Sequence, residues 1–300
     1  MAQELEVEVQ REVGRIRDQP DTAVTEALRL GKRGRIYDLD CTRWSGMPVA
    51  PEHPAFQVLS YRTPRGARNQ RDIAWLDRGN DVGLGILSDL IIGTTHTGTH
   101  LDALSHVTCG EHSQWFGGHE ADEYLGDFGP LRADAMSIPP VVTRGVLVDV
   151  AKYLNMGALP RSYVISAALI VDVLRAAGTE LRENDAVLVR TGYMSVWPEK
   201  EIAAGHAGAG IDRSAARFLA ERGVVLVGAD TEGLEVHPSG DPSNPLPVHT
   251  ELLVDNGIHI LELANLEALS ADGVTEFCFI CLPLRIKGAT GSMVRPIAII

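Results

Sequence analysis

Between residues 145 and 230 the chain alternates short apolar runs with longer segments in which apolar residues recur at helical spacing. The spacing predicts strands over residues 145–151, 185–192 and 224–230 and helices over residues 165–178 and 213–223. The first of these helices has Ser166 at its expected start and Gly178 at its expected end, which are residue types that favour those positions. Strands that alternate with helices indicate an α/β fold.

Further apolar runs extend this pattern toward both ends of the chain. We expect strands within residues 36–40, near 56–61, within 258–266 and within 276–286, and one or two surface helices within residues 4–32. Residues 42–80 contain four prolines and are expected to form mainly long loops. Cys278 and Cys281 lie inside an apolar run, so we interpret them as part of a buried strand rather than as half of a zinc site.

The charge balance limits the partners that the chain can have. Its 40 acidic and 27 basic residues give a formal net charge of −13, which disfavours nucleic acid and anionic membranes as partners. No apolar run approaches the ~20 residues of a membrane-spanning helix, and the N-terminus lacks a signal-peptide pattern, so we expect a cytoplasmic protein. Four arginines from Arg62 to Arg71 are interpreted as a solvated loop, with an anionic substrate or partner chain as the alternative.

Residues 96–106 read HTGTHLDALSH and contain the densest group of metal-ligand side chains in the chain. Neutral imidazole and carboxylate oxygen are ligands for zinc, manganese or iron(II). On a flat strand His96 and Asp102 would lie ~20 Å apart at ~3.3 Å per residue, too far for one ion. On a helix His96 and His100 would share a face, but Asp102 would point away. We therefore expect the backbone to curl at Gly98 and to hold these side chains on a bent strand end or loop.

The alternative for this motif is a set of polar loop residues satisfied by hydrogen bonds, which the density of three histidines and one aspartate disfavours. The motif resembles His-x-Gly-Thr-His-x-Asp-x-x-x-His of the cyclase family of metal-dependent amidohydrolases, which includes bacterial kynurenine formamidases and isatin hydrolases. Shorter stretches follow the family's order, among them VLVRTG (187–192), GVVLVGAD (223–230), PVHTELL (247–253) and GIHILELANLEAL (257–269).

The resemblance covers about residues 36–300 and implies a single α/β domain there. Its fold would be a mixed, barrel-like β core with flanking helices, the swivelling β/β/α arrangement. Residues 1–35 would form an N-terminal helical extension that packs either on a partner subunit or on its own subunit. Family members are dimers or tetramers, so the resemblance also implies a homodimer or a homotetramer.

The resemblance further implies a metal centre for one or two divalent ions, zinc or manganese. His96, His100 and Asp102 match the ligands of a first ion, and Asp102 can bridge to a second. His249 and Glu262 match the remaining ligands of two-metal members. Glu262 lies in the apolar run ILELANL, where a carboxylate needs a strong partner such as a cation. The alternatives are an edge-strand carboxylate facing water for Glu262 and an ordinary loop residue for His249.

His106 matches the residue that serves as proton donor and acceptor in the family, and an imidazole with a pKa near ~6.5 suits that role. The implied reaction is metal-dependent hydrolysis of a C–N bond in an amide, an imide or a cyclic amide of a small molecule. Two alternatives are a lyase or cyclase that uses the ion to stabilise an enolate and a non-catalytic metal- or ligand-binding protein on the same scaffold.

The sequence constrains the substrate less closely. Kynurenine formamidases carry a tryptophan after a Pro-Val pair, where this chain has Ala50, so a different or larger substrate group is expected. We expect Ala50, Trp115 and His119 to contact the substrate, with residues 115–129 forming a lid. The polar residues of that segment would suit a solvated loop equally well.

Overall fold

The computed structural model describes residues 12–300 of the chain, and a curled sheet of nine strands forms its centre. The strands follow one another in the order β1–β15–β13–β7–β9–β11–β12–β4–β14. They are β1 (Ile36–Asp38), β4 (His100–Asp102), β7 (Val141–Asp149), β9 (Ala186–Arg190), β11 (Leu226–Ala229), β12 (His259–Glu262), β13 (Glu276–Cys281), β14 (Gly291–Met293) and β15 (Ile297–Ile299).

The direction of the strands changes across the sheet. The four central strands β7, β9, β11 and β12 run parallel, whereas β13 on one side and β4 on the other are antiparallel to their neighbours. Every residue of β9 and β11 is buried, and both strands are apolar runs apart from the terminal Arg190, as expected for strands covered on both faces. The predicted α/β fold with a mixed, barrel-like β core is confirmed.

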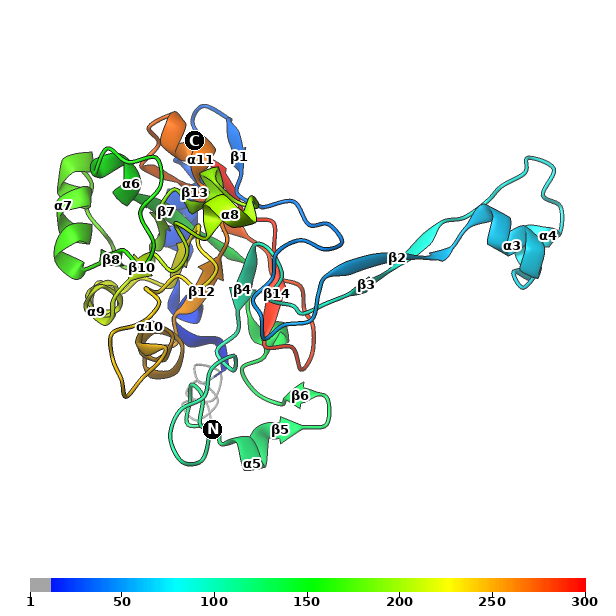
Figure 1. Ribbon diagram of the computed structural model, residues 1–300, viewed down its shortest axis with the longest axis horizontal. Coiled ribbons are helices and arrows are strands. Elements are labelled where there is room, and N and C mark those ends of the chain that lie inside the picture. The colour runs from blue at the N-terminus through cyan, green and yellow to red at the C-terminus, as the bar shows by residue number, and fades with distance from the viewer. Residues whose placement is uncertain (1–11) are drawn as a thin grey trace.

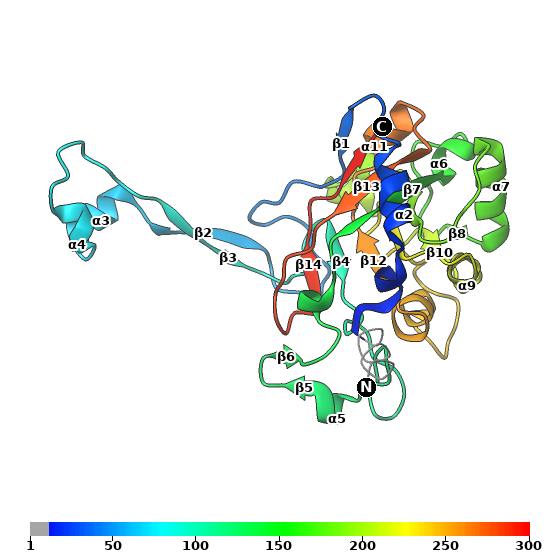
Figure 2. The same cartoon turned by 180° about the vertical axis from the view of Figure 1, so that it is seen from behind.

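Helices cover both faces of the sheet (Figures 1 and 2). They include α2 (Asp21–Leu28), α6 (Val150–Tyr153), α7 (Ala167–Ala177), α9 (Arg213–Glu221), α10 (Pro247–His249) and α11 (Glu267–Ala271). The predicted ends of α7 are confirmed: the Ser166 side chain accepts a hydrogen bond from the amide of Leu169, and Gly178 ends the helix at a φ of 67°. One apolar core includes Ile170 and Leu219 of α7 and α9, and a second core includes Phe277 of β13.

The N-terminal segment packs on its own subunit. It contains a 3₁₀ turn (Gly14–Asp18) and α2, which lies against β7 and β13. Ile16 and Ala27 are buried there, and Arg15 donates hydrogen bonds to the carbonyls of Asn256 (3.0 Å) and Ala220 (2.5 Å). Of the two alternatives for the expected extension, these contacts favour packing on the same chain. The part of that prediction that falls on residues 1–11 lies outside the described residues.

A long projection leaves the body of the molecule (Figures 1 and 2). It consists of the antiparallel strands β2 (Gln57–Arg62) and β3 (Ser88–Ile92), with α3 (Pro64–Gln70) and α4 (Ala74–Asp77) at its tip. We call residues 57–92 the arm. The expectation of mainly loops over residues 42–80 is wrong here, because Thr63 caps a helix by accepting from the amide of Gly66 and Pro64 occupies its first turn.

The remaining described elements are short. They are α5 (Ala121–Tyr124), β5 (Leu125–Gly126), β6 (Gly129–Pro130), β8 (Val164–Ile165), α8 (Lys200–Ala203), β10 (Gly210–Ile211), 3₁₀ turns at Ala135–Ser137 and Tyr193–Ser195, and a π-helical turn at Thr250–Asp255. Cys278 and Cys281 are buried in β13, as predicted. Among residues 12–300 no helix is both long enough and apolar enough to cross a membrane.

Candidate metal centre

The HTGTH segment curls before it enters β4. Gly98 adopts a φ of 61°, and a Cβ atom at this position would lie 2.9 Å from Sγ of Cys41. Only a residue without a side chain fits both the backbone conformation and the space. His96 therefore lies in the loop and His100 opens the strand, so the predicted curl at Gly98 is confirmed.

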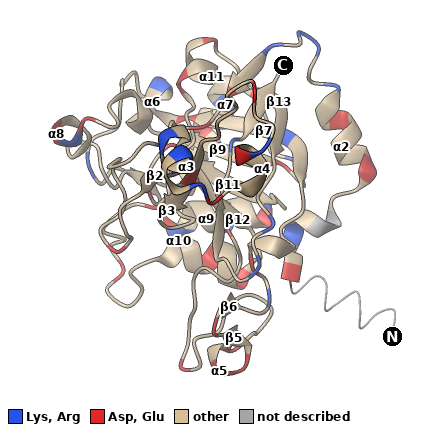
Figure 3. Cartoon of the chain, turned by 90° about the vertical axis from the view of Figure 1, so that its right-hand side faces the viewer, with Lys and Arg blue, Asp and Glu red and all other residues tan. Residues whose placement is uncertain are grey.

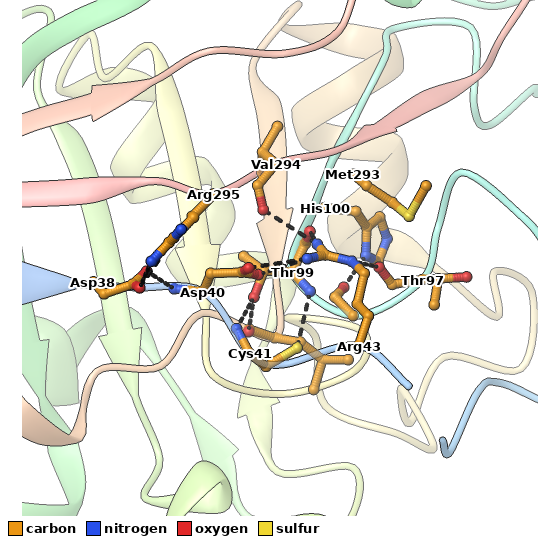
Figure 4. Close-up of polar contacts among 12 residues, drawn as sticks. Asp38, Asp40, Cys41, Arg43, Thr97, Thr99, His100, Met293, Val294 and Arg295 are labelled. Atoms are coloured by element: carbon orange, nitrogen blue, oxygen red, sulfur yellow. Dashed lines mark hydrogen bonds and ion pairs between the residues drawn. The ribbon is translucent and has the colours of Figure 1, made fainter. Parts of the chain in front are cut away.

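Arg43 fixes this loop through hydrogen bonds to its backbone (Figure 4). Its guanidinium donates hydrogen bonds to the carbonyls of Thr97 (2.9 Å), Thr99 and Val294 (3.1 Å), and it forms an ion pair of 2.9 Å with Asp40. A planar guanidinium with five donors can bind several acceptors at once. The arginine thus fixes the backbone on both sides of the glycine and immediately before His100.

Strand pairing brings Glu262 opposite His100. β12 pairs with β4 in a register that aligns these two residues, so their side chains lie on the same face of the sheet. The Glu262 Oε2 atom lies 3.2 Å from Nε2 of His100. Because β12 is an internal strand and Glu262 is buried, the alternative of an edge-strand carboxylate facing water is wrong.

Asp102 lies at the centre of the cluster. Its Oδ1 atom is 2.9 Å from Nδ1 of His96 and 3.5 Å from Nε2 of His100. His249, from α10, approaches from the other side, with its Nε2 atom 4.0 Å from Oδ2 of Asp102 and 3.4 Å from Oε1 of Glu262. His249 is buried within the cluster, so it is not an ordinary exposed loop residue. The fold thus brings together all five residues that the sequence pointed to as ligands.

His106 joins the same cluster. Its ring stacks on that of His96 with 4.0 Å between ring centroids and lies 6.5 Å from that of His249. Two groups of ligand atoms, each compact enough for one ion, share Asp102: His96 with His106, and His100 with Glu262. A shared carboxylate is the arrangement expected where two ions are bridged.

The side chains present fit a divalent cation. Oδ2 of Asp102 is buried and has no hydrogen-bond partner among the described residues. Asp102 and Glu262 place two buried carboxylates side by side, and neither lysine nor arginine lines the cavity in the described part of the chain. Burying unpaired carboxylates is costly unless a cation compensates them. Imidazole nitrogens and carboxylate oxygens form a donor set that suits zinc, manganese or iron.

The titration behaviour of the cluster follows from burial and neighbouring charge. Burial alone would raise the pKa of Asp102, but the imidazoles of His106, His96 and His100 hold it below its usual value. Burial lowers the pKa of His106 to about 4, so this imidazole is neutral at pH 7. Burial would also lower the pKa of His249, but its hydrogen bonds to carboxylates raise it to about 10.

Outer partners orient two of the imidazoles. Nδ1 of His100 bonds to the carbonyl of Gly98 (2.7 Å), which leaves Nε2 to face the carboxylates. Nδ1 of His249 lies 2.5 Å from Oε2 of Glu235, and the same oxygen accepts the backbone N–H of His249 at 3.0 Å. Such a carboxylate behind a histidine fixes which ring nitrogen faces the centre. The sequence analysis missed Glu235, although, like Glu262, it stands between apolar residues in the run LEV.

The centre opens into a cavity of about 150 Å³. Ala50, one of the predicted substrate contacts, lines it. So do Glu52, His53 and Glu232, which the sequence analysis did not single out. Nothing in the sequence marks these three residues as functional, because isolated polar residues in loops are common.

The other two predicted contacts, Trp115 and His119, lie elsewhere. Trp115 is buried in the larger apolar core, and the ring of His119 packs edge-on against Tyr124. Residues 115–129 contribute no side chain to the lining of the cavity, so this structure does not place the expected lid over it.

The fold and the centre together define an α/β protein with a buried histidine–carboxylate site of the kind that binds divalent metal ions. Comparison with known proteins makes the assignment more specific. The model of the Cyclase family matches residues 37–236. The chain belongs to the cyclase family.

Individual relatives agree with this assignment. An isatin hydrolase from Roseibium aggregatum is 25% identical over 275 residues, which cover 89% of this chain and 93% of that protein. A crystal structure described as a novel cyclase superposes with a TM-score of 0.82 at 26% identity and covers 97% of both chains. Isatin hydrolase A from Labrenzia aggregata, bound to benzyl benzoate, has the same fold, with a TM-score of 0.64 at 23% identity, covering 91% of this chain and 98% of that chain.

Proposed function

We propose that this protein is a metal-dependent hydrolase that cleaves a C–N bond in an amide, an imide or a cyclic amide. The observation that carries the proposal is the buried cluster of His96, His100, His249 and Glu262 around Asp102, with His106 at its edge. The likeness to an isatin hydrolase over 89% of the chain supports the reaction class.

In this proposal His96, His100, Asp102, His249 and Glu262 hold one or two divalent ions, zinc or manganese. When bound, such an ion polarises a carbonyl group and makes water more acidic. The protein supplies the fixed geometry: Asp102 lies between the two groups of ligand atoms, and Glu262 and His100 face one another across paired strands.

His106 carries the proton in this proposal. Because burial keeps its ring neutral at pH 7, a ring nitrogen can accept a proton from the attacking water and return it to the departing nitrogen as the C–N bond breaks. Its position supports this role, since His106 lines the cavity beside the candidate ligands.

The cavity lining narrows the class of substrate. Glu52 and Glu232 offer hydrogen-bond acceptors to the pocket, and among the described residues no lysine or arginine faces it. A substrate with N–H donors, such as an amide or an imide, fits this lining. The small side chain of Ala50 leaves room beside the centre.

We also infer that the protein acts in the cytoplasm. All four cysteines are free thiols and three of them are buried, which suits a reducing compartment.

The test begins with the metal content of protein purified without chelator, measured by plasma mass spectrometry. One or two equivalents of zinc or manganese are expected, with loss in His100→Ala and partial loss in Glu262→Ala. A folded wild type that contains no metal and takes up none would refute the proposal.

Activity is then measured on cyclic amides, imides and formanilides in ¹⁸O-labelled water. Label in the product is expected for hydrolysis. A product that forms without label would identify the lyase or cyclase alternative instead, and metal binding without turnover of any of these compounds would favour the non-catalytic alternative.

A further inference from the structure

We propose that His53 binds the substrate by donating a ring N–H to a second carbonyl oxygen, next to the C–N bond that is cleaved. The substrate class then narrows to imides and related compounds, in which an N–H lies between two carbonyl groups. This inference rests on the proposed function and adds a specificity-determining residue to it.

The backbone of His53 is fixed by a short turn. Its N–H donates to the carbonyl of Ala50 at 3.0 Å, and Pro51 and Pro54 lie within and directly after this turn. Each proline has a fixed φ, so the backbone on both sides of His53 has little freedom. Phe56, which follows, is buried and anchors the segment to the body. The side chain of His53 therefore extends from a constrained backbone.

The ring of His53 lies against the candidate ligand His96. The two rings are parallel to within 6°, and their centroids are 5.6 Å apart. Aromatic rings at this separation attract one another when they are offset. His96 is itself fixed, because its ring nitrogens lie 2.9 Å from Oδ1 of Asp102 and 3.0 Å from Oγ1 of Thr290. A side chain that belongs to the centre thus orients the ring of His53.

The ring nitrogens of His53 are free to bind a ligand. Neither nitrogen has a hydrogen-bond partner among residues 12–300, and neither is fully buried. The residue lines the cavity at the centre. In either protonation state an imidazole has at least one N–H to donate. The cavity therefore contains a donor that the protein itself does not use.

No other described side chain of the cavity lining offers such a donor. The other imidazoles of the lining belong to candidate ligands and to His106, the proposed proton carrier. Glu52 and Glu232 offer acceptors, and the remaining lining residues are apolar or glycine. The lining thus provides acceptors for an N–H and one side-chain donor for a carbonyl oxygen that does not face the metal centre. An imide presents both groups.

The arginines nearest to His53 in the sequence do not supply donors to the cavity. None of the arginines from Arg62 to Arg71 lines it, and α3 carries two of them. Figures 1 and 2 show α3 at the tip of the arm, away from the body, and Figure 3 shows its basic residues in blue. A carboxylate is commonly bound by a guanidinium that reaches both oxygens. The single N–H of His53 suits one carbonyl oxygen better.

A competing role for His53 is that of a further metal ligand. Two groups of ligand atoms in the centre each lie within 4.8 Å of one another, and His53 belongs to neither group. Its position in the lining instead favours contact with a molecule in the cavity.

The experiment compares glutarimide with 2-piperidinone, which lacks one of its two carbonyl groups. Isothermal titration calorimetry measures their binding to the zinc-loaded His106→Ala variant, in which the proposed proton carrier is absent. Adding His53→Phe keeps a flat ring beside His96 but removes both nitrogens. We expect it to weaken glutarimide binding by about 5-fold to 10-fold, as the loss of one hydrogen bond does, and to leave 2-piperidinone binding unchanged.

Two further variants in the same background separate binding from structure. His53→Gln restores an N–H donor and should recover most of the lost affinity for glutarimide. His112→Phe replaces an exposed histidine outside the lining, so it is the matched control and should bind both compounds as its parent does. The zinc content of all variants, measured by plasma mass spectrometry, should be equal.

The outcomes distinguish this inference from the proposed function. Equal losses for the two compounds in His53→Phe, a loss of zinc in that variant, or a His53→Gln variant that binds glutarimide as weakly as His53→Phe would overturn the role of His53 and leave the proposed function intact. Zinc-loaded protein that bound neither compound would count against the proposed function, and this inference would fail with it.

Discussion

At the residue scale, Glu235 stands behind His249 and sets which nitrogen of that ring faces the candidate ligands. In Glu235→Gln the side chain loses its negative charge, and its NH2 group replaces the oxygen that accepts from the backbone N–H of Val248 (3.4 Å). We expect the affinity for zinc to fall by ~10-fold to 100-fold, as is typical when such a partner is lost. Titration of metal-free protein with zinc in competition with a chromophoric chelator measures the change.

Glu251→Gln is the control for that substitution. Glu251 is buried to a similar extent and lies two residues after His249, but it pairs with Arg213 and Arg217 instead of the cluster. Its zinc affinity should match that of the wild type. An equal loss of zinc affinity in the two variants would mean that Glu235 acts on the metal only through the stability of the fold, as any buried carboxylate in this region would.

His259 couples stability to pH. Burial lowers its pKa in the folded state, while its ring nitrogens face the carbonyls of Asp102 (2.8 Å) and Val13 (3.4 Å). Below ~6.5 the unfolded chain binds a proton that the folded chain resists, so the free energy of unfolding should decrease as the pH falls, by at most ~1.4 kcal/mol per pH unit. In the presence of EDTA, urea unfolding at pH 7.5 and pH 5.5 should show a smaller decrease for His259→Gln than for the wild type. Equal decreases would assign the acid sensitivity to other groups.

Sequence alone located the candidate ligands but not the residues that orient them. The ligands of the HTGTH segment lie close together in the chain, and Glu262 is conspicuous as a carboxylate in an apolar run. Arg43 and Glu235 are ordinary charged residues in the sequence. Their roles depend on contacts with Thr97 and His249, which only the folded backbone creates.

At the element scale, α2 is part of the core rather than an appendage. Ala27 is fully buried where the helix packs on β7 and β13. Ala27→Asp should reduce the free energy of unfolding by about 3–5 kcal/mol, because it buries a charge without a partner. Thr25→Asp, on the exposed face of the same helix, should change it by less than ~0.5 kcal/mol. Urea midpoints provide the measurement, and similar values for the two variants would contradict the packing of α2.

The regular elements of the α/β core were predictable because their periodicity and caps are local. The helix between Ser166 and Gly178 and the buried strands β9 and β11 follow the predicted ranges closely. The helices of the arm were not predicted, since α3 contains Gly66 and is only seven residues long. The pairing of β12 with β4, which builds the centre, joins segments about 160 residues apart and has no local signal.

At the scale of the whole molecule, the architecture followed from the family resemblance more than from residue patterns. Alternating strands and helices indicate the α/β class, but the order of nine strands, with β14 and β1 at opposite edges, depends on contacts distant in sequence. Of the arm, only β2 had a counterpart in the prediction, the strand expected near residues 56–61; the pairing of β2 with β3 and the helices at the tip were not predicted.

The arm starts and ends at one point on the body. Gln57 at its start is paired with Ile92 at its end. The chain leaves the lining of the cavity after His53 and returns to it at His96. A segment with adjacent ends can be lengthened, shortened or replaced without rerouting any strand of the sheet. The arm and the candidate centre are therefore separable parts of this fold, and a lineage can change the length or sequence of one contiguous insertion while the candidate centre stays intact.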